Sequence, residues 1–83
     1  MVNLHWSNRE KKDLEQRILH LRDDQVGALL ITAGLGFRKE DIEDIVRDIK
    51  TDGLQSGHLE IVLAEADSKE DLLWWIAYFE KHR

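Results

Sequence analysis

Hydrophobic residues recur every three or four positions along most of this chain, the spacing of helices that bury one face. The clearest case is residues 39–50, where four branched aliphatic side chains share one side: Ile42, Ile45, Val46 and Ile49. The pattern predicts five helices. They cover about residues 8–22, a segment from Asp23 or Asp24 to Gly34 or Gly36, residues 39–50, a short segment after Ser56 that buries Leu59, Val62, Leu63 and Ala66, and residues 69–82.

Capping residues and glycines mark where these helices begin and end. Ser7 with Glu10 three residues later has the spacing of a capping box, and Ser68 with Asp71 forms a weaker one. The chain has five glycines and no proline, so we expect short glycine turns rather than long loops. The predicted fold is all-α, a compact bundle of about five short helices joined by glycine turns.

Two residues of the first half indicate close packing. Gly27 lies inside a predicted helix, where glycine costs about 1 kcal/mol relative to alanine. We expect a neighbouring helix to cross the backbone there, and the alternative is a ligand that approaches the main chain. Phe37 follows the Gly34-Leu35-Gly36 turn and is expected to fill the corner between two helices.

The last predicted helix is apolar on more than one side. Four side chains share its inner face, with Leu73 at the margin: Leu72, Trp75, Ile76 and Phe79. Trp74 and Tyr78 lie on nearly the opposite side, four residues apart. One interpretation makes this helix the centre of the bundle, with Trp74 and Tyr78 against Val2, Leu4 or Trp6. The other makes Trp74 and Tyr78 an exposed patch, and we predict that they form a partner-binding site, because aromatic residues are enriched in interface hot spots.

The helix over residues 39–50 carries an acidic face opposite its apolar one. Like charges repel between Glu40 and Asp44 and between Asp44 and Asp48, and pairs of Glu43 with Lys39 and Arg47 offset this only in part. Such a face is retained either as a solvated surface or for a basic partner. We include five of its residues in the predicted partner site: Glu40, Glu43, Asp44, Arg47 and Asp48.

Length and charge narrow the possible partners. With 83 residues, 42% of them hydrophobic, residues 1–83 are expected to form a single helical domain. The first 22 residues carry a net charge of +2 and the remainder −7, which gives −5 overall. Because a negatively charged protein repels the phosphate groups of DNA and RNA, nucleic acid is an unfavourable partner. Residues 24–50 have the outline of a helix-turn-helix, but the second helix offers mainly acidic groups to base edges.

No stretch carries a motif specific to one chemistry, so we expect no enzyme, no metal and no cofactor. Cysteine is absent, and the four histidines lack the spacing of a zinc site on a helix. Residues 48–60 resemble a calcium loop in part, but Lys50 stands where an oxygen ligand is needed. No run is long enough to span a membrane, and the start lacks the features of a secretion signal, so the expected location is the cytoplasm.

The layout of short helices with charged outer faces is similar to that of the death-fold class of homotypic interaction modules, including bacterial effector-associated versions. The resemblance covers the helical order and implies an adaptor. Our first hypothesis is a non-enzymatic protein-interaction module, an adaptor or a subunit that assembles with a second copy. The alternatives are an acidic inhibitor or antitoxin-like protein that covers a basic surface, and a helix-turn-helix regulator.

Overall fold

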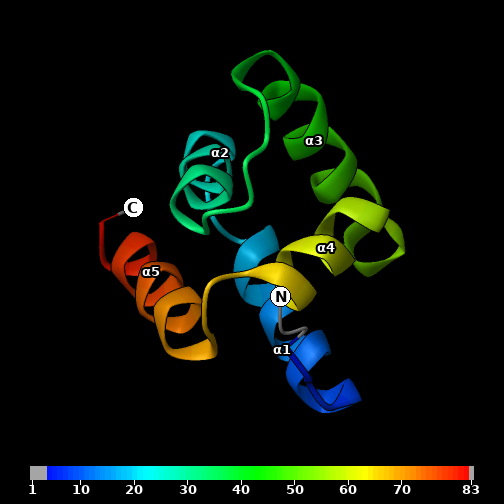
Figure 1. Cartoon of the computed structure of the whole chain (residues 1–83), viewed down its shortest axis with the longest axis vertical. Coiled ribbons are helices and arrows are strands. Elements are labelled where there is room, and N and C mark those ends of the chain that lie inside the picture. Colours follow the sequence, from blue (N-terminus) through cyan, green and yellow to red (C-terminus); the bar gives the residue numbers. More distant parts are fainter. Residues whose placement is uncertain (1–3, 83) are drawn as a thin grey trace.

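The computed structural model describes residues 4–82, and within them the chain is all-α, as the sequence predicts. Figure 1 shows the arrangement of the helices, in which α2 packs between α3 and α5. The elements in chain order are α1 (Asn8–Leu19), α2 (Asp23–Thr32), α3 (Lys39–Asp52), the 3-10 turn η1 (Gly53–Gln55), α4 (Gly57–Glu65) and α5 (Lys69–Lys81).

All five α-helices contribute to one hydrophobic core. The predicted inner faces contribute to this core, and α4 buries the whole set that the sequence assigns to it: Leu59, Val62, Leu63 and Ala66. On α5 only Leu72 and Ile76 of the predicted face are fully buried, while Trp75 and Phe79 are partly buried. Ile42 differs from the prediction for α3, because it is only partly buried at the edge of the core while Ile45, Val46 and Ile49 are fully covered. Phe37 packs partly buried against the core, edge-on to the ring of His58.

Serine caps begin three of the helices where the sequence predicts them. At α1, Ser7 Oγ accepts from the N–H of Glu10 at 3.1 Å, and the Glu10 carboxylate accepts from the N–H of Ser7 at 2.8 Å, so the capping box is complete. Ser56 caps α4 by accepting from the N–H of His58. Ser68 caps α5 by accepting from the N–H of Asp71 at 3.0 Å.

The boundary between α1 and α2 differs from the prediction. Helix α1 ends at Leu19 instead of residue 22, and the ammonium group of Lys50 on α3 donates to the carbonyl oxygens of Leu19 and Leu21 there. The residue before α2 is Arg22, and neither Asp23 nor Asp24 caps the helix. Instead, the side-chain oxygen of Gln25 accepts from the N–H of Arg22 at 3.0 Å. A distant lysine thus satisfies main-chain carbonyl oxygens at the end of α1.

Glycine lies close to the ends of α2 and α3. Helix α2 ends at Thr32, one residue before its C-cap Ala33, and Gly34 and Gly36 follow in the turn. Helix α3 runs to Asp52, two residues further than predicted, and ends at Gly53, whose φ of 56° is left-handed. Residues 48–52 are therefore helical and do not form a loop.

Helix α3 crosses α2 directly over Gly27. A Cβ at Gly27 would lie 3.3 Å from Cγ2 of Ile42 and 3.8 Å from Cγ2 of Val46. The expected close approach of a neighbouring helix is therefore confirmed, and it brings the two backbones together at this point.

Candidate protein-interaction site

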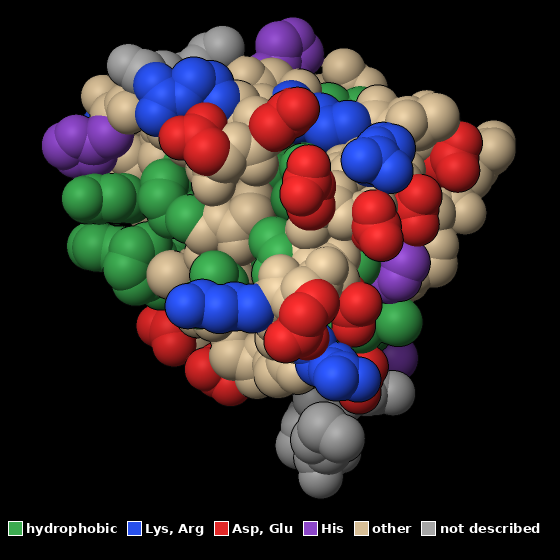
Figure 2. Space-filling model, turned by 90° about the horizontal axis from the view of Figure 1, so that it is seen from above, with side chains coloured by type: hydrophobic (Ala, Val, Ile, Leu, Met, Phe, Trp, Pro, Cys, Tyr) green, Lys and Arg blue, Asp and Glu red, His purple; other side chains and the backbone are tan. Residues whose placement is uncertain are grey.

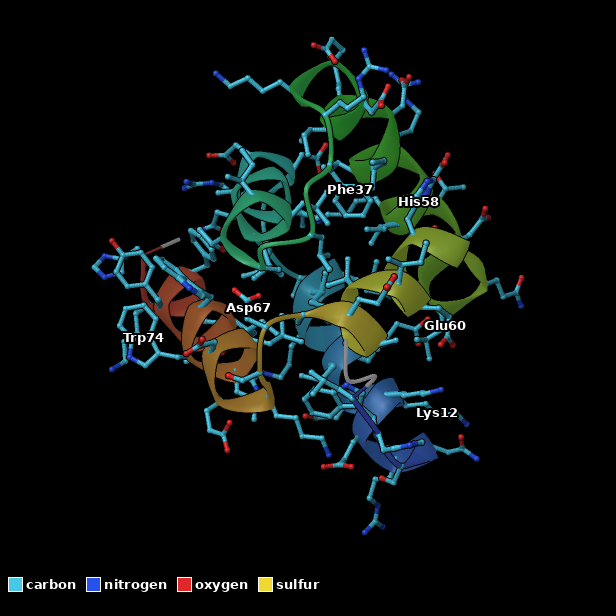
Figure 3. The ribbon with its side chains drawn as sticks, viewed as in Figure 1. Lys12, Phe37, His58, Glu60, Asp67 and Trp74 are labelled. Atoms are coloured by element: carbon cyan, nitrogen blue, oxygen red, sulfur yellow. The ribbon has the colours of Figure 1, made fainter. Side chains whose placement is uncertain are left out.

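The outer side of α5 carries exposed hydrophobic side chains, which we call the aromatic ridge: Leu73, Trp74 and Tyr78. Trp74 is 58% exposed and Tyr78 40% exposed, although both are large and apolar. On the inner side of the same helix Leu72 and Ile76 are fully buried, and this fixes which side faces outward. Figure 3 shows Trp74 pointing away from the rest of the protein, and Figure 2 shows hydrophobic side chains gathered at the same edge of the molecule.

The rings of the ridge are stacked on one another. The Trp74 and Tyr78 rings have centroids 5.5 Å apart and planes 11° from parallel. Trp75, which is partly buried beneath them, meets Trp74 edge-on at 4.9 Å, and the imidazole of His82 lies 4.4 Å from the Tyr78 ring. Such contacts restrict the rotamers of these side chains, so little conformational entropy remains to be lost when a partner binds.

The described part of the N-terminal segment, from Leu4 on, does not cover the ridge. Its described part lies against the end of α4, where Leu4 donates its N–H to the carbonyl oxygen of Ala64 at 2.8 Å. The Trp6 indole donates to the carbonyl oxygen of Leu63 at 2.6 Å. The interpretation that places Trp74 and Tyr78 against this segment is therefore wrong for Leu4 and Trp6. Val2, which it also named, lies outside the described residues.

Two polar contacts fix the C-terminal half of α5 against the other helices. The guanidinium of Arg17 on α1 donates to both carboxylate oxygens of Glu80 on α5, at 3.0 and 2.8 Å. The same hydrogen bond raises the pKa of Arg17 above its ordinary value, since it favours the charged form. The side-chain amide of Gln25 on α2 donates to the carbonyl oxygens of Phe79 and His82. The helix that carries the ridge is therefore bonded to α1 and α2 near its C-terminal end.

The acidic face of α3 lies on a different helix from the ridge, and two of its carboxylates, Glu40 and Asp44, are paired with arginines. Glu40 is 3.3 Å from Arg38 and Asp48 is 3.4 Å from His58. Arg47 pairs with Asp44 at 3.3 Å. The expected pair of Arg47 with Glu43 is replaced by this contact. The structure therefore brings five of the predicted residues together on α3, separate from Trp74 and Tyr78 on α5, and these two groups do not form one site.

The sequence did not predict a groove of about 730 Å³ that opens between α2 and α3. Its apolar lining includes Ile31, which is 60% exposed. The sequence did contain a feature of this groove: the small residues Gly27 and Ala28 are followed by Ile31 on the same side of α2. The lining residues are Asp23, Asp24, Gly27, Ala28, Ile31, Lys39, Ile42, Glu43, Val46, Arg47, Lys50 and Thr51. We call this feature the α2/α3 groove.

Among residues 4–82, no three acidic or histidine side chains lie close enough together to hold a metal ion. The partial calcium loop of the sequence is taken up by the end of α3, the 3-10 turn and the cap of α4. Two of the histidines contact other side chains, His58 with Asp48 and His82 with Tyr78.

No protein-family model matches this chain, and the searches of curated proteins and of solved structures found no match either. None of the described helices has the length and apolar character that crossing a membrane requires.

Proposed function

We propose that this chain is a non-enzymatic protein-interaction module that binds its partner, another protein or a second copy, with the aromatic ridge of α5. One observation carries the proposal: Trp74 is 58% exposed and stacked on an exposed Tyr78 in a chain whose other two tryptophans are partly buried. Leaving such rings in water forgoes the free energy that their burial would contribute, so a partner that covers them gains it.

The composition and placement of the ridge fit an interface centre. Tryptophan and tyrosine are enriched among residues whose truncation costs 2 kcal/mol or more of binding free energy. Leu73 extends the apolar area, and the buried neighbours Leu72 and Ile76 keep the helix in place. The cysteine-free sequence suits a reducing compartment, and we place the module in the cytoplasm.

The acidic face of α3 supports a second candidate function, an acidic inhibitor that covers a basic protein surface. The Asp44 and Glu40 side chains are each 73% exposed and Asp48 is 54% exposed, within a chain of net charge −5. An interface of this kind weakens as salt rises, because exposed charges more than about 10 Å apart are screened at 0.1 M ionic strength. Binding through the ridge depends much less on salt.

Site-specific crosslinking in the native cell tests the first function. A photoreactive amino acid at position 74 or 78 should capture a discrete partner, either a foreign protein or another copy. The same group at Ile61, an exposed isoleucine of α4 that lies outside the ridge, serves as the matched control. Equal capture from all three positions, or none from 74 and 78, would overturn the proposal. Capture from Glu40 and Asp44 alone, lost at high salt, would favour the inhibitor.

A further inference from the structure

We propose that the aromatic ridge of one copy lies in the α2/α3 groove of a second copy, so that the chain assembles head to tail with itself. The inference rests on the proposed function, because it takes the ridge as the docking surface and identifies what the ridge binds. Ridge and groove are different surfaces of the same chain, carried by α5 and by the pair α2 and α3 (Figure 1).

The two surfaces match in shape and apolar character. Gly27 and Ala28 keep the α2 wall of the groove low, and Ile31, Ile42 and Val46 supply apolar lining. The ridge presents two rings four residues apart on one side of a helix. An amphipathic helix that places apolar side chains at positions i and i+4 into a groove between helices is a recurrent mode of protein recognition.

The charges at the ends of the two surfaces are complementary. On α5, Glu70 and Lys81 lie one turn before Trp74 and two turns after it, on the same side of the helix. At the groove, Lys39 lines one end and Asp23 lines the other, and both are exposed. Opposite charges meet at both ends if Glu70 lies over Lys39 and Lys81 lies over Asp23.

The spacing of these charges agrees as well. Glu70 and Lys81 are eleven residues apart, about 16 Å along a helix. Lys39 and Lys50 are also eleven residues apart on α3, and the Nζ of Lys50 lies 3.7 Å from Asp23. Lys50 donates to two main-chain carbonyl oxygens and forms an ion pair with Asp23, whose side chain is 82% exposed and leaves its carboxylate open to a second cation at that end. One orientation, with α5 parallel to α3 of the second copy, satisfies both ends.

In the head-to-tail arrangement, unlike a two-fold dimer in which each ridge enters the other copy's groove, one ridge and one groove stay unused in every dimer. Further copies bind to the unused ridge and the unused groove, so the assembly grows beyond two subunits. It forms a ring if the rotation between copies closes and an open filament if it does not. A contact of ridge with ridge would instead stop at a symmetric dimer. This difference makes the proposal testable by mixing two variants.

The first variant, Trp74→Ser with Tyr78→Ser, lacks the ridge and keeps the groove. The second, Ile31→Glu, keeps the ridge and puts a carboxylate in the groove beside the expected position of Glu70. Both changes are at exposed side chains, and circular dichroism and melting curves check that each variant folds. Light scattering over a range of concentrations then measures molar mass for the wild type, each variant and their equimolar mixture.

We expect the wild type to exceed the mass of a dimer as concentration rises, and each variant alone to associate at least about thirtyfold more weakly. The mixture should form a one-to-one dimer and grow no further, because the working ridge of Ile31→Glu meets the working groove of the other variant. Lys39→Glu should weaken assembly, and adding Glu70→Lys to it should restore assembly.

Two results would overturn the inference and leave the proposed function standing. One is a wild type that stays monomeric while the ridge still crosslinks to a foreign protein. The other is a wild type that stops at a dimer, with no complementation in the mixture, which would show that ridge packs on ridge. Assembly that persists in Trp74→Ser with Tyr78→Ser would overturn the inference together with a role for the ridge in self-association.

Discussion

The side-chain amide of Gln25 on α2 donates a hydrogen bond of 2.9 Å to the carbonyl oxygen of Phe79 near the end of α5. The same nitrogen donates to the carbonyl oxygen of His82 at 3.2 Å, and the amide oxygen accepts from the N–H of Arg22. The Gln25 side chain is buried, and its partners in these three bonds are main-chain groups of the protein. One side chain therefore joins the start of α2 to the end of the helix that carries the ridge.

Replacing Gln25 by leucine should lower the free energy of unfolding by about 1–3 kcal/mol, because it removes the hydrogen bonds that this buried side chain makes to three partly buried main-chain groups. Urea unfolding measures the loss. Gln55→Leu, at an exposed glutamine of the 3-10 turn, is the control and should change stability by less than about 0.5 kcal/mol. Equal effects of the two substitutions would show that the hydrogen bonds of Gln25 contribute nothing.

Trp74 contributes little to the stability of the isolated subunit if its ring faces solvent. We expect Trp74→Ser to lower the free energy of unfolding by no more than about 1.5 kcal/mol at a concentration where the protein is monomeric, because only the contacts of its ring with Tyr78 and Trp75 are lost. Ile76→Ala, on the buried side of the same helix, should cost about 2–5 kcal/mol. A loss above about 2 kcal/mol for Trp74→Ser would mean that the ring is buried in the subunit and would remove the basis of the ridge.

Residues that act within one helix were predictable from the sequence. Periodicity identified Leu72 and Ile76 as buried and left Trp74 outside, because a helix turns about 100° per residue whatever surrounds it. The Ser7 capping box was likewise local. We predicted Trp74 as part of an exposed patch, but the alternative of a Trp74 covered by Trp6 could be decided only by where the segment containing Trp6 packs.

Features that depend on contacts between segments far apart in the chain were not predicted from the sequence. The carbonyl oxygen of Leu19, at the end of α1, accepts from Lys50, which lies 31 residues later in the chain. The α2/α3 groove depends on how two helices diverge from their close contact at Gly27, and no sequence period reports a crossing angle. Sequence patterns therefore placed the ridge and could not place the groove that we propose as its partner.

Gly53 ends α3 in a conformation that alanine adopts only with strain. Its φ is 56°, and a Cβ there would meet the carboxylate of Glu15, which accepts from the N–H of Leu54 at 2.7 Å. We expect Gly53→Ala to destabilise the protein by at least about 1–2 kcal/mol. Thermal unfolding compares it with Gly57→Ala, where a Cβ meets nothing within 4 Å and stability should rise by about 0.4–1 kcal/mol. Stabilisation by both substitutions would contradict the left-handed turn.

The capping box of α1 should make stability depend on pH in the acid range. The hydrogen bond that the N–H of Ser7 donates to the Glu10 carboxylate lowers the pKa of Glu10 below its ordinary value of about 4.3. A lowered pKa in the folded state stabilises the protein above the ordinary pKa, and this contribution is lost as pH falls through the lowered value.

Glu10→Gln isolates that contribution, because the amide oxygen can still accept from Ser7 but does not titrate. Urea unfolding of both proteins at pH 7 and pH 3 should show the wild type losing more stability than Glu10→Gln as pH falls. The pKa of Asp24 is also lowered, by its hydrogen bond with Arg22, but Asp24 is present in both proteins and its effect cancels in the comparison. An identical loss in the two proteins would mean that the Glu10 carboxylate gains nothing from its charge, and that the cap acts only as a neutral hydrogen bond.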